Sequence, residues 1–447
     1  MPFKQKNFSL SFIPVELAAI TIALLIYSGL CTPVNRTTFL SLLPSKSITY
    51  IEGVIVSNPV KTSSQRYYSM ELKTSYTSTH FPPQWDKGVF SKSTGTILLL
   101  VNTKEVEGLF PGKLYSNSKN TARGAARNVE IYEKGAKLKV NTNWLQPDST
   151  QIQKKSIFSS PYTKTVFIAK DIEHCGWISM LAKTRAQSRL IFRRILFLWG
   201  DAGGLLLALL SGTREYTNQT LSEAFRNAGL AHILALSGMH LSLFAGLAKK
   251  IGTHTGGKKF STFLAPLLII LFVWFAGISP SLFRALLCTY IGMIASLCYI
   301  NTRFSAVLAL SFLLQVSFFP QDAFSAAFIL SYGALGGIII GEKIFLTINN
   351  RFFPTCISSG LTASQGAQLC TAPITASLFG SIMPIGIISS VIISPLASVF
   401  LVFGLCCILL AMAVPVLMQP LGYAVQFLYS IVEYLVLFFA QFPKISF

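Results

Sequence analysis

The segment that decides the fold runs from Leu209 to Gly246 and reads LLSGTREYTNQTLSEAFRNAGLAHILALSGMHLSLFAG. If 223–242 forms one helix at about 100° per residue, its polar side chains share one half of the helical wheel and the other half is apolar. A charged side chain at mid-membrane costs at least ~2.5–3.5 kcal/mol, so this face is expected to line a bundle interior or an aqueous path rather than lipid. The polar residues are Glu223, Arg226, His232, Ser237 and His240.

Two features of the same segment leave its structure open. Gly229 and Gly238 can interrupt the helix, as in pores where irregular backbone lines a cavity. The serine and histidine side chains can also serve as hydrogen-bonding contacts between neighbouring spans, with no aqueous path. Both interpretations place the segment inside a membrane.

The composition of the whole chain is that of an integral membrane protein. Its 447 residues are 52% hydrophobic and 12% charged, whereas soluble domains carry about 25% charged residues. Residues 224–447 contain 10 Lys and Arg and only three acids, Asp322, Glu342 and Glu433. The formal net charge of +20 favours an anionic partner, either nucleic acid or acidic lipid, although cytoplasmic loops of membrane proteins also retain Lys and Arg.

Apolar runs predict a polytopic α-helical membrane protein of about 8–10 spans. The first run, Phe8 to Leu30, is preferred as an uncleaved anchor within residues 1–45 over a signal peptide, because further spans follow. Lys4 and Lys6 before it place the N-terminus in the cytoplasm and the next segment outside. The polytopic domain is expected over 200–447, with apolar segments at about 202–211, 229–248, 262–278, 282–300, 304–319, 325–346, 361–383, 385–412 and 420–441.

Residues 46–145 are predicted to form a small all-β, OB-like domain outside the membrane. Five short β-prone runs alternate with turn signals there, and side chains in RYYSMELKTSYTS alternate with the period of a strand. The window carries 14 Lys and Arg against seven acids, interleaved with aromatic residues. Because phosphates need positive charge and bases need flat faces, the domain is a candidate receiver of single-stranded DNA. The candidate residues are Lys61, Arg66, Tyr67, Tyr68, Lys73 and Trp85.

Residues 146–199 are expected to be a linker followed by a basic amphipathic helix over 181–199. Four arginines alternate with large apolar residues in that helix: Arg185, Arg189, Arg193 and Arg194. Such a helix lies in the plane of the lipid headgroups, most simply as a membrane anchor.

Two later stretches carry polar groups inside apolar runs. In GISPSLFRALL, Ser279 is the expected N-cap and Pro280 the first helical residue, so Arg284 lies about one turn into the helix, where the macrodipole disfavours a cation. This position suggests an anionic visitor or an acidic partner, unless the arginine snorkels to the headgroups. In SQGAQLCTAPITASLFG, Gln365 precedes Pro373, which is expected to kink or break the span.

No motif indicates a cofactor or an enzyme active site. The chain has no GxxxxGK[ST] loop for nucleotide phosphates, no HExxH or carboxylate–histidine cluster, and no metal-ligand spacing among its eight cysteines. Ser237 and His240 are the residue types of a serine protease, but their spacing of three on one helix does not align a nucleophile with its base. We therefore expect no cofactor and no enzymatic activity.

These segments resemble the ComEC family of competence proteins. SGTR at 211–214, followed by EAFRNAGLAHILALSGMHLSLFAG, is similar to that family's Gly-x-Arg-like turn and helix, and GISPSLFRALL to its S-P-x-x-R-A helix. DAFSAAFILSYGALGG and SIMPIGIISSVIISPLASV resemble two later segments, although the first lacks the family's Pro-Gly step and Gln. The resemblance covers about 200–412 and is weaker over 46–145. It marks as motif positions Arg214, Glu223, Arg226, His232, Ser237, His240 and Arg284.

The resemblance implies transport of single-stranded DNA across the plasma membrane during natural transformation, with this chain as the channel subunit. The candidates for the DNA path are the motif positions together with Gln365. Many family members end in a metallo-β-lactamase-like nuclease domain, and this sequence ends at Phe447 without one. Besides DNA and the lipid bilayer, the implied partners are therefore a separate DNA receptor, a nuclease and a helicase-like cytoplasmic motor. A transporter of small solutes or lipid-linked substrates is the alternative function, and an intramembrane serine protease that uses Ser237 and His240 is a less favoured one.

Overall fold

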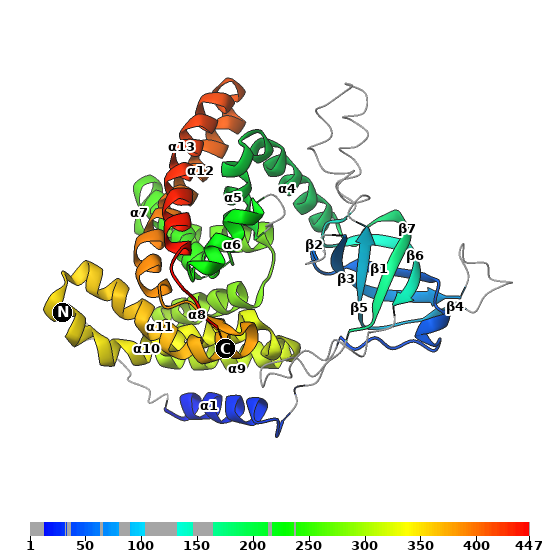
Figure 1. Cartoon of the computed structure of the whole chain (residues 1–447), viewed down its shortest axis with the longest axis horizontal. Coiled ribbons are helices and arrows are strands. Elements are labelled where there is room, and N and C mark those ends of the chain that lie inside the picture. The colour runs from blue at the N-terminus through cyan, green and yellow to red at the C-terminus, as the bar shows by residue number, and fades with distance from the viewer. Residues whose placement is uncertain are drawn as a thin grey trace. The chain divides into compact units, whose positions relative to one another are not determined.

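The computed structural model describes residues 13–31, 33, 37–62, 66–79, 90–102, 132–145, 164–212, 217–236 and 238–446. The chain divides into two compact units (Figure 1). One unit, between Asn35 and Gly200, combines a small β-barrel with a helix. The other unit is helical and comprises the first helix and the residues from Asp201 onward.

In the described residues of the first unit, seven strands form a single sheet. Five of them close into a ring in the order β1, β3, β5, β7, β6 and back to β1, in which β5 and β7 are parallel and the other pairs antiparallel. The short strands β2 and β4 pair with β3. The predicted small β-domain is thus confirmed as a five-stranded barrel. The strands are β1 Tyr50–Ile55, β2 Val60–Lys61, β3 Tyr67–Ser78, β4 Phe90–Lys92, β5 Thr96–Asn102, β6 Ala136–Leu145 and β7 Val166–Trp177, and a 3₁₀ turn, Ser45–Ser47, precedes them.

Alternating side chains build the core of the barrel. In β3 Met70 and Leu72 are buried and Lys73 is exposed, as the period of two in RYYSMELKTSYTS predicts. Ile97 and Leu99 of the neighbouring strand β5 are fully buried beside them. Closure of the ring through the short β5–β7 pairing gives each of the five strands two neighbours, and the inward side chains form one apolar core.

The last strand, β7, lies in the segment that was expected to be a linker. It pairs with β6 along its length and in parallel with β5, and Phe167 is buried in the barrel core. The β-domain therefore continues to Trp177 and does not end at residue 145. The apolar run Val166–Ala169 is the signal for this strand, but it is short and charged residues follow it directly. One of the five β-prone runs expected in the domain, KLYSNSKNT at 113–121, lies outside the described residues.

Helix α4, Met180–Leu198, confirms the predicted basic helix and begins at the N-cap Ser179. Two of its arginines are buried and form ion pairs with the same acid, Glu133, which precedes β6. Arg189 Nε lies 3.3 Å from Glu133 Oε2, and Arg193 Nη2 contacts Glu133 Oε1. Burial by itself would raise the pKa of Glu133, but the neighbouring arginines hold it below its ordinary value. The position of α4 among lipid headgroups stays a prediction.

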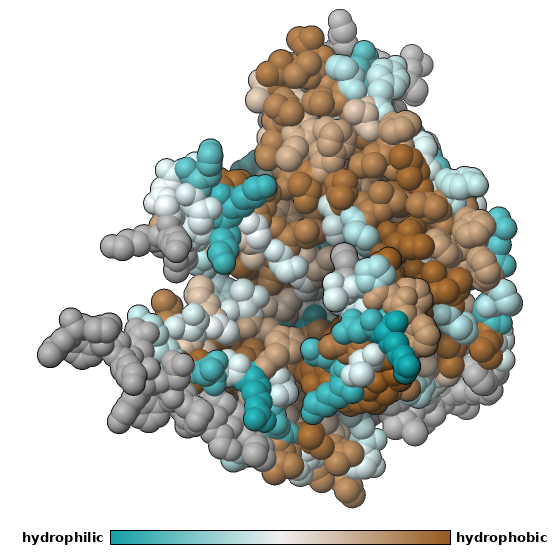
Figure 2. All heavy atoms as spheres, turned by 90° about the vertical axis from the view of Figure 1, so that its left-hand side faces the viewer, coloured by the Kyte–Doolittle hydropathy of each residue, from teal (hydrophilic) through white to brown (hydrophobic). Residues whose placement is uncertain are grey.

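The second unit contains the predicted apolar helices. Among the described residues, four helical stretches are long and apolar enough to cross a membrane: Pro280–Leu297, Ala326–Phe352, Gly386–Ala413 and Pro415–Ala440. They indicate a multi-pass membrane protein, and the larger count of about 8–10 spans stays a prediction. Figure 2 shows broad areas of apolar side chains on the surface, as contact with lipid requires. The helices are α1 Ile13–Tyr27, α5 Gly200–Ser211, α6 Gln219–Asn227, α7 Gly238–Ala276, α8 Pro280–Leu297, α9 Phe304–Phe318, α10 Ala326–Phe352, α11 Thr355–Phe379, α12 Gly386–Ala413 and α13 Met418–Ala440, with 3₁₀ turns at Pro320–Phe324 and Pro415–Leu417.

Glycines decide how several of these helices pack. Helix α7 consists of two segments joined at Gly257, which has φ 76° and ψ −173°. Helices α10 and α11 approach so closely that a Cβ on Gly337 would lie 2.2 Å from the carbonyl oxygen of Gly366. Small residues at such contacts let the backbones of membrane helices approach. Helix α11 runs without interruption through Pro373, so a break at this proline is wrong, and the alternative of a kink stays a prediction.

A short two-stranded sheet connects the segment after α11 with the segment after α13. Strand β8, Ser381–Ile382, follows α11 and pairs antiparallel with β9, Ile445–Ser446, which follows α13. The segment after α13 is therefore held beside the α11–α12 connection.

Candidate functional site

Helix α6 does not continue into the next helix. The chain turns at Gly229, whose φ of +75° lies in the left-handed region that glycine adopts readily, and α7 begins at Gly238. The single helix expected over 223–242 is therefore wrong, and the interruption at Gly229 is confirmed. The polar residues of this segment do not share one helical face.

The turn after α6 is held against the start of α12. Ser389 donates its hydroxyl to the Ala228 carbonyl at 2.7 Å. A Cβ on Gly229 would lie 2.7 Å from the Cα of Gly386, so a side chain at Gly229 would push the two segments apart. Non-helical backbone at membrane depth is tolerated where protein buries it or where it lines a cavity. In this turn Leu230, Ile233 and Leu234 are buried within the helical unit, whereas Ala231 and His232 are exposed.

The far end of the same turn meets the start of α8. Ser281 donates its hydroxyl to the Leu236 carbonyl at 2.6 Å. A Cβ on Gly238 would lie 3.4 Å from Nη2 of Arg284. The structure therefore brings together the two stretches that the sequence marks separately, Leu209–Gly246 and GISPSLFRALL. Ser237, which lies between the two contacts, is outside the described residues.

Arg284 is a buried cation in α8. The helix begins as predicted, with Ser279 as its N-cap and Pro280 as its first residue, and Arg284 is only 6% exposed. Its Nη1 donates to the Ser331 carbonyl of α10 at 2.6 Å, and its guanidinium carbon lies 6.0 Å from the ring centroid of Tyr332. Among the residues that the structure describes, Nε has no hydrogen-bond partner and no carboxylate lies within 4.0 Å of the guanidinium.

This environment can be compared with two of the alternatives for Arg284, snorkelling and an acidic partner. Snorkelling requires the charged end to reach the headgroups, and a buried guanidinium does not fit that description. An acidic partner is absent among the described residues. A guanidinium taken out of water without a counter-ion is unfavourable by several kcal/mol. An anionic visitor, whose phosphate or carboxylate oxygens a guanidinium would bind through charge-assisted hydrogen bonds, stays a prediction.

Polar groups from three helices meet beside Arg284. The Tyr332 hydroxyl of α10 donates to Gln315 Oε1 of α9 at 3.0 Å, and Gln315 donates to the Pro280 carbonyl of α8 at 3.0 Å. The Ser311 hydroxyl lies 3.3 Å from that of Tyr332, and Ser311 and Gln315 are fully buried. Interhelical hydrogen bonds of this kind hold membrane helices in one arrangement. They fix the three helices that surround the guanidinium.

The other candidates of the helical unit are dispersed. Glu223 and Arg226 are exposed on α6, and His232 is exposed in the turn that follows. His240, in the first turns of α7, is fully buried. Arg214 lies outside the described residues.

Gln365 takes part in a contact between helices. Its Oε1 accepts a hydrogen bond from Asn349 Nδ2 of α10 at 2.8 Å. The same Asn349 nitrogen donates to Thr362 at 2.9 Å. The amide of Gln365 therefore has a structural partner, and the structure does not place it beside Arg284.

The residues of the β-domain that were predicted to contact DNA lie partly on the outer surface of the barrel and partly in its core. Tyr67 and Lys73 point outward from β3, and Arg66 before it is exposed. Tyr68 belongs to the inward row and is only 3% exposed, so its selection as a base-stacking residue is wrong. Lys61 belongs to β2, and Trp85 lies outside the described residues.

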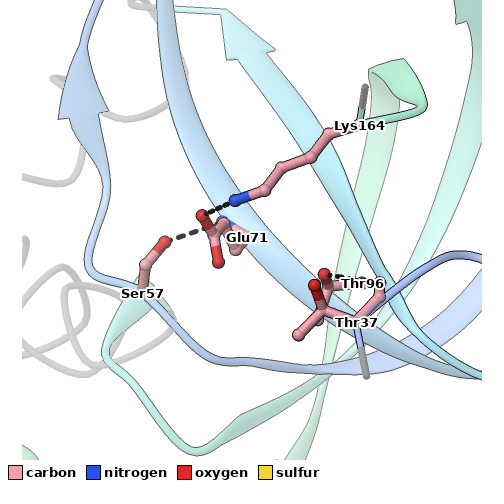
Figure 3. A network of polar contacts seen from close by, with 5 residues as sticks. All are labelled: Thr37, Ser57, Glu71, Thr96 and Lys164. Carbon is pink, nitrogen blue, oxygen red and sulfur yellow. Dashed lines mark hydrogen bonds and ion pairs between the residues drawn. The ribbon is translucent and has the colours of Figure 1, made fainter. Parts of the chain in front are cut away.

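One acid on the outer face of β3 is already paired. Lys164, just before β7, forms an ion pair with Glu71, and the Glu71 amide donates to the Ser57 hydroxyl at 2.8 Å (Figure 3). Nearby, the Thr96 hydroxyl donates to the Thr37 carbonyl at 3.1 Å. The Glu71 carboxylate is therefore neutralised locally and does not offset the charge of the outward lysines.

Sequence reasoning missed the residues of α10 that contact Arg284. Ser331 and Tyr332 lie in DAFSAAFILSYGALGG, where a polar pair inside an apolar run was the available signal. Glu133, the partner of the buried arginines of α4, was also missed, because a single acid in a basic window gives no indication of burial. No group of three His, Cys, Asp or Glu residues that could hold a metal occurs in the described part of the chain.

Comparison of the sequence with known proteins finds a matching family and several relatives. The family model described as "Competence protein" matches residues 209–447, which contain every residue of the Arg284 site. The chain is 28% identical over 175 residues to ComE operon protein 3 of Bacillus subtilis (strain 168), covering 39% of this chain and 22% of that protein. It is 26% identical over 218 residues to Recombination protein 2 of Haemophilus influenzae (strain ATCC 51907 / DSM 11121 / KW20 / Rd), covering 44% and 27%.

A third relative is an uncharacterized protein of Aquifex aeolicus (strain VF5), 25% identical over 249 residues, which are 54% of this chain and 55% of that protein. The chain thus covers less than two thirds of the length of each of these relatives. No solved structure matches the chain.

Proposed function

Because the chain belongs to the competence protein family, we propose that it is the channel subunit that carries single-stranded DNA across the plasma membrane during natural transformation. The observation that carries this proposal is Arg284, a buried guanidinium in a candidate span with no carboxylate partner among the described residues. A passing phosphate supplies the missing negative charge. Ionisable residues inside membrane segments mark substrate and ion pathways.

One arginine supplies the kind of contact that a conduit needs. Binding along a path has to be favourable enough for the strand to enter and weak enough for it to leave. The Arg284 side chain already donates to the Ser331 carbonyl, so a phosphate gains only the remaining donors of the guanidinium. We therefore expect a transient contact at this point of the path and no tight site.

The barrel supports the proposal as the part that receives the strand. A five-stranded barrel has the strand number of an OB-fold, a fold that binds oligonucleotides on its strands and loops. The proposed orientation has the N-terminus in the cytoplasm and the barrel outside, as the lysines before the first helix suggest. A nuclease, a DNA receptor and a helicase-like motor are proposed as separate partners.

The test is uptake of fluorescently labelled DNA into a nuclease-protected cytoplasmic pool. We expect deletion of the protein to abolish uptake and to leave surface binding of DNA intact. Arg284→Gln is expected to lower uptake at least about tenfold, since hydrogen bonds to charged groups contribute ~1.5–3 kcal/mol. Arg303→Gln is the matched control, because it removes the same charge from an exposed residue before α9.

The outcomes separate the alternatives. Unchanged uptake in the deletion strain contradicts DNA transport and favours a transporter of small solutes or lipid-linked substrates. If the deletion blocks uptake but Arg284→Gln at matched expression behaves like Arg303→Gln, transport stands and Arg284 does not line the path. Arg284→Lys keeps the charge and is expected to retain part of the activity.

A further inference from the structure

A stacked aromatic pair lies on the outer face of the barrel. The rings of Tyr76 in β3 and Phe90 in β4 are 5.1 Å apart between centroids, with an interplanar angle of 18°. Tyr76 is 40% exposed, so one large aromatic side chain of this small domain remains open to solvent. Neither ring belongs to the apolar core of the barrel.

A β-bulge is what brings Tyr76 to the surface. Along β3 the even-numbered residues from Tyr68 to Thr74 are buried, and a strand without irregularity would continue with Tyr76 facing inward. Between the register pairs Gly53–Thr74 and Glu52–Tyr76 the strand contains one extra residue. The bulge reverses the alternation and turns Tyr76 outward, and bulges of this kind re-aim side chains next to functional sites.

Three exposed lysines lie on β3, on β4 and on the nearby strand β6. Lys92 is the register partner of Tyr76 on β4 and is exposed. Lys73, the preceding outward residue of β3, is exposed, as is Lys137 of β6. Lys73 and Lys137 are both register partners of Val54 in β1, so an apolar residue separates the two ammonium groups.

Three acids of β1, β3 and β7 are close to this surface, and two lysines lie beside them. The Glu71 carboxylate is ion-paired with Lys164 (Figure 3). Glu52, the register partner of Tyr76 on β1, lies opposite Lys139 of β6, and Lys139 in turn lies opposite Glu173 of β7. In the described register pairs none of Lys73, Lys92 and Lys137 lies opposite an acid, so these three lysines carry the positive charge around the stacked rings.

We propose that Tyr76 and Phe90 form a platform on which a base of single-stranded DNA stacks, while Lys73 and Lys92 bind the adjacent phosphates. Stacking accepts every base, because each has a flat aromatic face, and lysines on either side follow the backbone. This assignment rests on the proposed transport function and names the place on the barrel that receives the strand.

The experiment measures binding of a fluorescent 12-nucleotide oligo-dT to the full chain in lipid nanodiscs by anisotropy. An abasic strand of the same length has the phosphates and lacks the bases. Tyr76→Thr keeps a good strand former at an exposed position and removes the flat ring. We expect it to weaken oligo-dT binding about 5- to 150-fold, the effect of losing one stacked base, and to leave binding of the abasic strand unchanged.

Two further variants test the parts separately. Tyr76→Phe retains the ring and is expected to bind like the wild type. Lys92→Gln is expected to weaken both strands and to reduce the slope of log affinity against log salt by about 0.7, the value per phosphate contact on single strands. Lys183→Gln, which removes an exposed charge on α4, is the control and is expected to leave that slope unchanged.

The outcomes distinguish this assignment from the transport function. Equal affinity of Tyr76→Thr and wild type for oligo-dT overturns the platform, even where deletion of the protein still abolishes DNA uptake. Binding of a neutral polysaccharide that depends on Tyr76, with no binding of oligo-dT, assigns the surface to a glycan and also overturns it. Loss of uptake on deletion tests transport alone, so the two proposals fail separately.

Discussion

At the scale of single residues, the buried arginines of this chain lie in two environments that differ in whether a carboxylate is present. Arg189 and Arg193 of α4 share the Glu133 carboxylate inside the barrel unit. Arg284 has a backbone carbonyl and an aromatic face, with no carboxylate among the described residues. The first environment contains its counter-ion, and the second contains none among the described residues. Substitutions at the Glu133 site should therefore change the stability of the fold, and substitutions at Arg284 should change DNA uptake.

Glu133→Gln is expected to destabilise the barrel unit. Removing one partner of a buried ion pair leaves uncompensated charge and costs ~3–5 kcal/mol. The folded pKa of Glu133 is below its ordinary value, so its contribution is fully present above about pH 4.3 and is lost as the pH falls through the lower folded pKa. Urea unfolding followed by tryptophan fluorescence should show the difference between variant and wild type shrinking below about pH 4.

Arg284→Met should separate function from stability. An apolar side chain of similar length avoids burial of an unpaired charge, so thermal stability is expected to stay unchanged or to rise by up to ~1–4 kcal/mol. DNA uptake is expected to fall as far as in Arg284→Gln. Thermal unfolding of the purified protein and uptake in cells are measured for the same variant. A destabilised protein would show instead that the guanidinium has a structural role.

At the scale of elements, the turn between α6 and α7 depends on one glycine. Gly229 has a positive φ and lies against Gly386 at the start of α12. The turn sets the distance between α6 and the start of α8, since Leu236 at its far end accepts a hydrogen bond from Ser281. A change in this turn should therefore disturb the surroundings of Arg284 without touching α8 itself.

Gly229→Ala is expected to lower both stability and uptake. The new Cβ would meet the Cα of Gly386 at 2.7 Å, and an alanine at positive φ adds a cost on the order of 1–3 kcal/mol. Gly292→Ala is the matched control, because this glycine lies inside α8 with nothing within 4 Å of the added Cβ. Thermal unfolding should show a loss for the first variant and no loss, or a gain of up to ~1 kcal/mol, for the second.

At the scale of the whole molecule, the proposed orientation places the barrel outside the membrane. Cys175 at the end of β7 is a free, exposed thiol, and Cys406 in α12 is an exposed thiol within a candidate span. These two cysteines make it possible to test the side of the barrel and the burial of α12 in lipid by the same chemistry.

A variant that retains Cys175 alone is expected to react in intact cells with a membrane-impermeant maleimide. Partial burial raises the pKa of Cys175, so the reaction should be faster at pH 9 than at pH 7, since the thiolate is the nucleophile. A variant with Cys406 alone should remain unlabelled, because charged reagents do not enter the lipid. Labelling of Cys175 only after the cells are opened would contradict the proposed orientation and place the barrel in the cytoplasm.

Several features could be predicted because they depend on neighbours in the chain. The start of α8 follows from Ser279 and Pro280, which cap and begin a helix through local contacts. The inward and outward rows of β3 follow from strand geometry as far as Thr74. The bulge after Thr74 could not be predicted, since it depends on pairing with β1, which is distant in sequence.

By itself the sequence determined that the chain is a membrane protein of the competence family with a basic β-domain, because composition, apolar length and motif residues are local properties. Only the tertiary structure decided that the helix expected over 223–242 turns at Gly229, that Tyr68 is buried while Tyr76 is exposed, and that Arg284 has no carboxylate partner among the described residues. The physical reason is that burial, register and counter-ions are set by segments that meet only when the chain has folded.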